Sequence, residues 1–380
     1  MTDTAGSVTA AALRDRLAAG DPVTLLDVRN RDDVDRWRIE GPSVDRHHVP
    51  YMKFVAAGAT GGAADLVPAN AREPIVVVCP RGEASAEVAA GLAAAGVDAE
   101  NLAGGMDAWA RLLGRSPVPA EGGDATVYQY HRPASGCLGY AVVAGGEMAV
   151  IDPLRAFVDR YRADAADLGA TITYAVDTHV HADHVSGVRA LSAATDATPV
   201  LSASAVGRGV VGTFDMVRDG DVLDVGGASV AAVALPGHTT GMTGFRIGGT
   251  LLTGDSLFLD AVARPDLQED ADPAVQAREL YATLTERLGA FGDDVLVAPG
   301  HTDAGVGDDT PAVARLGDLR GRLPLFGTDE STFVDRVTRA GAEPANAARI
   351  AAVNRGVETV DDETAFELEL GPNNCAAGGV

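Results

Sequence analysis

The sequence contains few lysines, cysteines and aromatic residues, and this scarcity excludes several classes of protein. Its 380 residues include Lys53 as the single lysine, three cysteines and 5% aromatic residues. Three cysteines that lie far apart argue against a disulfide framework, so each thiol must be judged by its surroundings. No apolar run approaches the roughly 20 residues that a membrane-spanning helix needs. We therefore expect a globular protein stabilised by packed cores.

Positive charge is also scarce, since 54 acidic residues face 30 basic ones and give a formal net charge of −24. Such a surface repels phosphate backbones and anionic lipids, so we expect neither nucleic acid nor a membrane as a partner. Adaptation to concentrated salt, as in halophilic proteins, is the explanation favoured by the charge pattern, and a GC-rich coding bias is the alternative. The opening residues MTDTAGSVTA do not resemble a secretory signal, and we expect a cytoplasmic protein.

The chain is long enough for two domains, and its pattern changes near residue 115. The stretch Gly114–Ala125, GRSPVPAEGGDA, has two prolines, three glycines and no apolar periodicity. Before it, short apolar runs alternate with helical patterns, which indicates a small doubly wound α/β domain over residues 1–115. We assign residues 116–125 to a linker and residues 126–380 to a second domain.

The second domain is predicted to be an αβ/βα sandwich. Three closely spaced strand patterns follow the linker and predict an antiparallel meander. A helical pattern and the strand Thr171–His179 come next, and further strands cover Asp221–Asp255. Helical patterns occupy Pro273–Gly289 and the region beyond Thr310. This order places strands on the inside and helices on the outside.

Histidines cluster at the ends of the predicted strands of this domain. Thr178–His184, THVHADH, holds three histidines and an aspartate, and the stretches LPGHTTG, LLTGDSLF and VLVAPGH each add one such side chain. Strand ends at one edge of a sheet converge, so we expect a shared site there. Imidazoles and carboxylates suit zinc, iron or manganese, and the set contains no cysteine, which disfavours a thiolate zinc site. The expected metal ligands are His179, His181, Asp183, His184, His238, Asp255 and His301.

These motifs resemble those of the metallo-β-lactamase fold over roughly Thr126–Cys375, and the resemblance implies the αβ/βα sandwich. In the dinuclear hydrolases of this superfamily, the equivalents of all seven ligands hold two metals. In its persulfide dioxygenases, the equivalents of His179, His238 and Asp255 hold one iron and leave a face of the metal open. The ligands alone leave both arrangements open.

The segment after Asp255 resembles the persulfide dioxygenases more closely. Arg264 and Asp266 form an Arg-x-Asp at the spacing of that branch, where glyoxalase II hydrolases typically carry a lysine. Arg264 is a candidate catalytic residue that either clamps a substrate carboxylate or pairs with Asp266. The C-terminal part resembles the short dioxygenase tail. Residues 261–263, Ala-Val-Ala, replace a cysteine-containing turn common in the family, which leaves the thiol substrate open.

Cys79 is the second candidate catalytic residue. It follows an apolar strand and precedes a helix, where loop N–H groups and the helix N-terminus stabilise a thiolate, and the alternative is a buried structural cysteine. The flanking LLDVRNRDDVDRWRIEG and LAGGMDAWARL resemble a rhodanese domain over roughly residues 5–115, which implies that Cys79 carries persulfide sulfur. GPSVDRHHVP and Glu83 depart from the family pattern, and Arg81 would offset the charge of Glu83. We assign no chemistry to the remaining histidines and cysteines of the chain, which are His47, His48, His131, Cys137 and Cys375.

Together, the resemblances imply an enzyme that oxidises a low-molecular-weight thiol persulfide with O2 to sulfite, using one Fe(II) per chain. The rhodanese domain would add sulfur transfer, and the resemblance suggests a homodimer. The alternative is a dinuclear zinc thioester hydrolase of the glyoxalase II type, with two zinc ions. A non-catalytic sulfur carrier is a third hypothesis, which requires an empty metal site.

Overall fold

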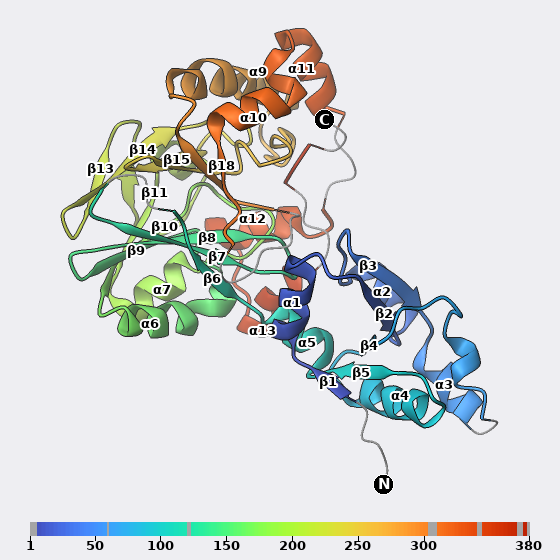
Figure 1. Ribbon diagram of the computed structural model, residues 1–380. Helices are drawn as coiled ribbons and strands as arrows, with labels where there is room; N and C mark the ends of the chain where they lie inside the picture. Colours follow the sequence, from blue (N-terminus) through green and yellow to red (C-terminus); the bar gives the residue numbers. More distant parts are fainter. Residues whose placement is uncertain are drawn as a thin grey trace.

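The chain folds into a smaller N-terminal body and a larger C-terminal one (Figure 1). The smaller body contains a five-stranded sheet, and the larger contains sheets of seven and six strands. This arrangement agrees with the two α/β fold classes expected from the sequence. The computed structural model describes residues 6–58, 61–119, 123–302, 310–339, 344–370 and 375–377.

The N-terminal body is a parallel sheet with the strand order β1-β5-β4-β2-β3. Its strands are β1 Gly6–Val8, β2 Val23–Asp27, β3 Val44–His48, β4 Ile75–Val78 and β5 Ala99–Leu102. Its helices are α1 Ala10–Ala18, α2 Arg31–Arg36, α3 Tyr51–Gly58, the single turn Ala64–Leu66, α4 Glu83–Ala94 and α5 Gly105–Ala110.

Strand β4 shows why both faces of this sheet are covered. Successive side chains of a strand point to opposite faces, and all four residues of β4 are buried. Val76 and Val78 pack in one apolar cluster, with residues of α1 and α5. Ile75 and Val77 pack in another, with residues of α3 and α4. A continuous apolar run of this kind is typical of a parallel sheet between two layers of helices.

The C-terminal body is a sandwich of two mixed sheets. The first has the order β12-β11-β10-β9-β8-β7-β6 and the second the order β13-β14-β15-β16-β17-β18. The strands of the first sheet are β6 Gly114–Pro117, β7 Thr126–His131, β8 Leu138–Ala144, β9 Glu147–Ile151, β10 Thr171–Val176, β11 Thr198–Ser202 and β12 Asp215–Val217. Those of the second are β13 Val222–Val225, β14 Ala228–Ala234, β15 Thr243–Ile247, β16 Thr250–Gly254, β17 Leu296–Pro299 and β18 Ala314–Arg315.

Helices cover the outer faces of both sheets (Figure 1). The inner faces share one apolar core, in which Val142 and Val176 of the first sheet pack with Phe245 and Leu252 of the second. The helices are α6 Val158–Asp167, α7 Val188–Thr195, α8 Ala203–Val206, α9 Pro273–Ala282, α10 Leu316–Arg322, α11 Glu330–Val337, α12 Ala347–Arg355 and α13 Asp362–Leu368. Short helical turns lie at Arg155–Phe157, Thr283–Arg287, Leu288–Ala290 and Pro324–Gly327.

The predicted linker is wrong at its start. Gly114–Pro117 form the edge strand β6, which pairs antiparallel with β7, and the predicted linker began at residue 116. Proline is tolerated in an edge strand because its missing N–H can face away from the neighbouring strand. The proline and glycine content that suggested a loop is therefore compatible with this strand. Residues 120–122 of the predicted linker lie outside the described residues.

Across the described ranges, we find no helix that combines the length and the apolar character needed to cross a membrane.

Candidate metal centre and sulfur-transfer loop

The seven predicted metal ligands all follow strands of the sandwich. Residues 179–184 come after β10, His238 after β14, Asp255 after β16 and His301 after β17. All seven side chains are largely or completely buried. The structure divides them into a group of three, a second group of three and a single histidine.

His179, His238 and Asp255 form the first group, and their ligand atoms lie within 4.8 Å of one another. Asp255 Oδ2 is 3.8 Å from His179 Nε2 and 3.9 Å from His238 Nε2. These distances are too long for hydrogen bonds, and the three atoms are buried with no partner among the described residues. A cation bound at about 2.1 Å from each atom would satisfy all three. The donor set therefore fits a metal ion.

Hydrogen bonds orient both imidazoles of this triad. His238 Nδ1 donates to the carbonyl of Arg264 at 2.8 Å, and His179 Nδ1 lies 2.9 Å from Thr178 Oγ1. Each ring thereby presents Nε2 to the site. Burial lowers the pKa of His179 and of His238, which keeps both rings in the neutral form that binds metals.

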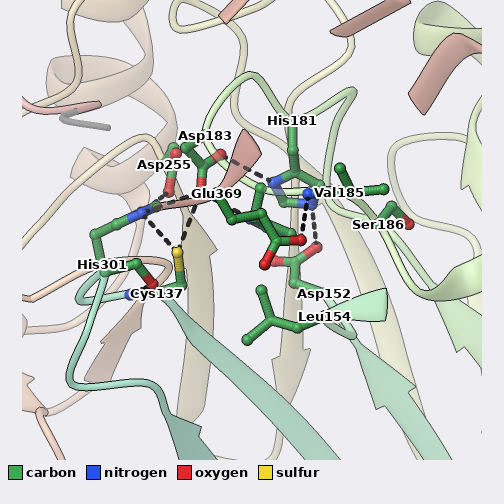
Figure 2. Close-up of polar contacts among 12 residues, drawn as sticks. Cys137, Asp152, Leu154, His181, Asp183, Val185, Ser186, Asp255, His301 and Glu369 are labelled. Carbon is green, nitrogen blue, oxygen red and sulfur yellow. Dashed lines mark hydrogen bonds and ion pairs between the residues drawn. The ribbon is translucent and has the colours of Figure 1, made fainter. Parts of the chain in front are cut away.

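Asp183, His184 and His301 form the second group, and Figure 2 shows Asp183 and His301 beside Asp255 of the triad. Asp183 Oδ2 is 2.7 Å from His184 Nδ1 and 3.2 Å from His301 Nε2. His301 Nδ1 lies 3.1 Å from Asp255 Oδ1. Asp255 therefore joins the two groups, because its Oδ2 faces His179 and His238 while its Oδ1 faces His301.

His181 turns away from the triad towards an acidic pair that the sequence interpretation did not include. Its Nε2 is 3.0 Å from Asp152 Oδ1 (Figure 2) and 3.6 Å from Asp177 Oδ1. Burial and the neighbouring His184 would lower the pKa of His181, but the charge of Asp152, the hydrogen bond that the ring donates to it and the nearby Asp177 carboxylate outweigh them and raise the pKa to about 9. Asp152 also accepts hydrogen bonds from the N–H and hydroxyl of Thr178, so it fixes the start of the histidine loop.

Two cysteines to which the sequence analysis assigned no chemistry lie at this centre. Cys137 Sγ is 3.3 Å from Asp183 Oδ2 and 3.4 Å from His301 Nε2 (Figure 2). The thiol of Cys375 lies within 4.8 Å of ligand atoms of Asp183 and His301. The sequence analysis had placed neither thiol at the predicted site. The tail reaches the site because Ala377 and Cys375 form backbone hydrogen bonds with Val262 and Arg264.

Arg264 adopts one of the two roles expected for it. Its guanidinium makes a bidentate ion pair with Asp266, with Nε 2.7 Å from Oδ1 and Nη2 2.8 Å from Oδ2. Its side chain is buried, and its carbonyl oxygen accepts the hydrogen bond that orients His238. The structure thus shows the Asp266 pair rather than a guanidinium open to substrate.

Cys79 lies in the loop between β4 and α4, where two donors reach its sulfur. The N–H of Gly82 is 3.0 Å and the hydroxyl of Ser85 is 3.1 Å from Cys79 Sγ. Glu83, whose charge departs from the rhodanese pattern, has its side chain in solvent, 3.7 Å from that of Arg81. Gly105 packs closely against the backbone of this loop, since a Cβ at that position would lie 2.3 Å from the carbonyl oxygen of Cys79.

A continuous set of hydrogen bonds connects this loop with the histidine loop. The N–H of Met106, in the first turn of α5, donates to the carbonyl of Cys79, and the carbonyl of Ala110 at the end of α5 accepts from Arg132 Nε at 3.1 Å. Arg132 forms a buried ion pair with Glu369. Glu369 Oε1 in turn accepts the N–H of Val185, the residue after His184, at 2.9 Å. The sequence offers no local signal for these contacts.

Comparisons with known proteins place both bodies in families. The family model of the metallo-beta-lactamase superfamily matches residues 132–301, and that of the rhodanese-like domain matches residues 9–112. The crystal structure of ETHE1 from Myxococcus xanthus is 30% identical in sequence and covers 60% of this chain and 97% of its own, with a TM-score of 0.54. The chain belongs to the metallo-beta-lactamase superfamily. It joins this metallo-beta-lactamase domain to an N-terminal rhodanese-like domain, as the sequence predicted.

Curated relatives of this chain include enzymes with two different named activities. Persulfide dioxygenase ETHE1 of Mus musculus is 27% identical over 258 residues, which are 66% of this chain and 96% of that protein. Its Homo sapiens counterpart is 30% identical over 158 residues, 41% of this chain and 59% of that protein. The hydroxyacylglutathione hydrolase of Polaromonas sp. is 35% identical over 160 residues, 41% of this chain and 57% of that protein. The relatives therefore include both activities that the sequence left open.

Proposed function

We propose that this protein is a persulfide dioxygenase that binds one Fe(II) at His179, His238 and Asp255. The observation that carries the proposal is the triad itself: two imidazole nitrogens and one carboxylate oxygen, buried and directed at one point, with no protein partner among the described residues. Two histidines and one carboxylate are the ligand set of many non-haem iron oxygenases. The matches to persulfide dioxygenases in mouse and human support this proposal.

The proposed reaction converts a thiol persulfide, O2 and water into the free thiol, sulfite and two protons. The persulfide loses four electrons overall and dioxygen gains them, and the S–S bond breaks with the thiol as leaving group. Bound Fe(II) would supply the redox chemistry that brings dioxygen and sulfur together. The chain buries the three ligand atoms, and a hydrogen bond to Arg264 or Thr178 fixes the orientation of each ring.

The rhodanese-like domain is proposed to carry sulfane sulfur on Cys79. The Gly82 N–H and Ser85 hydroxyl donate to the sulfur, and donors of this kind stabilise the thiolate that attacks a sulfur donor. A covalently joined domain keeps its product at a high local concentration near the metal centre. We therefore propose that the two domains act on the same pool of low-molecular-weight persulfide.

A dinuclear zinc thioester hydrolase is the second candidate, and a specific observation favours it. Asp255 faces both the triad and the group of Asp183, His184 and His301, as a bridging carboxylate of two metals would. The relative named hydroxyacylglutathione hydrolase agrees with this alternative. His181 argues against the dinuclear site. Its Nε2 is hydrogen-bonded to Asp152, and it is not among the three residues whose ligand atoms meet at the triad.

Oxygen uptake tests the proposal. The full chain, reconstituted with Fe(II) under nitrogen, is given persulfides of several thiols, and dissolved O2 and sulfite are measured together. The proposal predicts one sulfite formed for each O2 consumed. Hydrolysis of acyl-thioesters by the zinc-loaded chain, without O2 uptake by the iron-loaded chain, would establish the hydrolase instead.

A further inference from the structure

Two arginines of the sandwich have buried guanidinium nitrogens without a hydrogen-bond partner. Nε and Nη1 of Arg208 and Nε of Arg355 are each buried and have no acceptor among the residues that the structure describes. A buried N–H group without an acceptor destabilises the folded state, and in a native protein it often marks the place of a bound ion. An anion held between the two arginines would give all three nitrogens an acceptor.

Both arginines follow elements that pack against the histidine loop. Arg208 comes two residues after α8, and Arg355 is the last residue of α12. Ala205 of α8 and Ala351 of α12 share an apolar cluster with Val180, which lies between the first two histidines of that loop. The packing therefore holds both arginines close to the loop that carries the proposed metal ligands.

The segment that leads to Arg208 is also attached to the loop of His238. Ser202 Oγ donates to the carbonyl of Gly241 at 2.6 Å, and a Cβ at Gly241 would lie 2.6 Å from Ala205. Burial lowers the pKa of His238, and the charge of Arg208 lowers it further. The guanidinium group of Arg208 thus lies within electrostatic range of the metal centre.

The guanidinium groups of the two arginines also lie within electrostatic range of each other. The N–H of Val211 donates to the carbonyl of Arg355 at 2.7 Å, which joins the segment after Arg208 to the end of α12. Burial lowers the pKa of Arg208, and the positive charge of Arg355 lowers it further. An anion bound between two like charges of this kind relieves their repulsion.

Two nearby carboxylates limit the charge that such an anion can carry. Glu269 and Asp270 both have exposed side chains, and Glu269 Oε2 is 3.9 Å from Arg355 Nη2, which is too long for a hydrogen bond. Their negative charges raise the pKa of Arg208 and so partly offset the two arginines. A monoanion is therefore favoured over a dianion such as phosphate. A carboxylate has this charge, and its two oxygens match the paired N–H donors of arginine.

Apolar side chains beside the arginines suit a carboxylate that carries an alkyl chain. Val206, Val210 and Phe214 are partly buried and pack against the cluster that contains Ala205. Val211, between Val210 and Phe214 in the chain, is more than half exposed. An alkyl chain would remove some of this apolar surface from water, whereas a bare inorganic anion would contact only the arginines.

We propose that Arg208 and Arg355 bind a carboxylate that is attached to a short alkyl chain. The carboxylate belongs either to the thiol persulfide itself or to a free carboxylic acid that binds beside the metal centre. Only the first source rests on the proposed dioxygenase function. In that case the two arginines select substrates by the group at the far end from the sulfur.

Isothermal titration calorimetry on the full chain as purified tests the site at fixed ionic strength. The probes are butyrate, its uncharged analogue butyramide, and inorganic phosphate. We expect one saturable site for butyrate, at least tenfold weaker binding of phosphate, and no measurable binding of butyramide. Absence of saturable butyrate binding, or equal binding of butyramide, would overturn the proposal.

Variants locate the binding. Arg208→Gln and Arg355→Gln should each weaken butyrate binding at least tenfold. Arg349→Gln is the matched control, because Arg349 lies on α12, pairs with Glu358 and is half exposed, so its affinity should change less than twofold. Circular dichroism checks folding, and Arg355→Gln decides if Arg208→Gln misfolds. Wild-type affinity for butyrate in the folded glutamine variants would place its binding elsewhere and overturn the proposal.

Oxygen uptake identifies the source of the carboxylate, with the persulfides of 3-mercaptopropionate and of 2-mercaptoethanol as substrates. If the substrate supplies it, Arg208→Gln raises KM for the 3-mercaptopropionate persulfide at least tenfold and leaves kcat, and the KM of the neutral persulfide, within about twofold. If a free acid supplies it, Arg208→Gln loses butyrate binding but changes both KM values equally. Absence of O2 uptake with every persulfide would refute the dioxygenase function, and the calorimetry would still decide the carboxylate site.

Discussion

Whether the site holds one metal ion or two depends on which group the Nε2 atom of each histidine faces. His179 and His238 present Nε2 to Asp255 because other groups occupy Nδ1. His181 belongs to the same short motif, but its Nε2 is held by Asp152. The motif THVHADH therefore supplies side chains with different roles, and the sequence spacing alone could not distinguish them.

Two substitutions separate these roles. His238→Ala should reduce the iron content of the reconstituted protein at least tenfold and abolish O2 uptake with persulfide, because it removes one of three ligands. His181→Gln keeps a donor towards Asp152 and should retain close to one iron per chain. Metal analysis after desalting measures both, with His47→Ala in the other domain as a control. Loss of iron in His181→Gln would show that this histidine is a ligand and would contradict the triad.

Cys79 provides a second test at the scale of one residue. Cys79→Ser should abolish thiosulfate sulfurtransferase activity and leave persulfide oxidation within about twofold of the wild type, because the metal ligands lie in the other domain. Ser85→Ala, which removes one donor to the sulfur, should weaken the sulfurtransferase activity only partly. Sulfurtransferase activity that survives in Cys79→Ser would exclude Cys79 as the sulfur carrier.

His131 makes stability depend on pH. Burial and the charge of Arg14 lower its pKa from 6.5 to about 3. Between these values the unfolded chain binds a proton that the folded protein does not, so the free energy of unfolding falls as the pH is lowered from 6.5 towards 3. His131→Asn should reduce that slope by up to about 1.4 kcal/mol per pH unit. Urea unfolding at several pH values measures it, and an unchanged slope relative to the wild type would contradict the buried, neutral state.

At the scale of elements, the sequence predicted the site residues that directly follow a strand but not those that reach the site through contacts distant in the chain. The ends of β10, β14, β16 and β17 were predictable because each apolar run stops at a histidine or aspartate motif. Cys137, Cys375 and Glu369 were not, because they reach the centre through pairings over long stretches of chain, such as the bridge of Cys137 with His301. Strand β6 was missed because edge strands tolerate the residues that also mark loops.

Helix α13 and the segment after it hold the histidine loop through Glu369. Glu369→Gln would leave the buried guanidinium of Arg132 without its counter-charge, and breaking a buried pair of this kind costs about 3–5 kcal/mol. We expect a loss of unfolding free energy of that size in urea, together with weaker iron binding. Glu367→Gln, at an exposed position on the same helix, is the control and should change stability by less than about 0.5 kcal/mol. Equal behaviour of the two variants would show that the pair does not support the loop.

At the scale of the whole molecule, the two domains are joined by more than their covalent connection. Arg132 contacts the end of α5 in the rhodanese-like domain and Glu369 in the sandwich. The sequence predicted both folds and the order of the domains, because each fold follows from local apolar patterns. It could not predict the contacts between the domains, because these contacts join residues far apart in the chain.

The metal content of the full chain tests the central claim most directly. The protein is produced with iron and zinc both available, purified without oxygen, and analysed for metals by mass spectrometry with the protein concentration measured independently. The triad of His179, His238 and Asp255 predicts close to one iron per chain and little zinc. Two zinc ions per chain, lost together in His181→Gln, would contradict it.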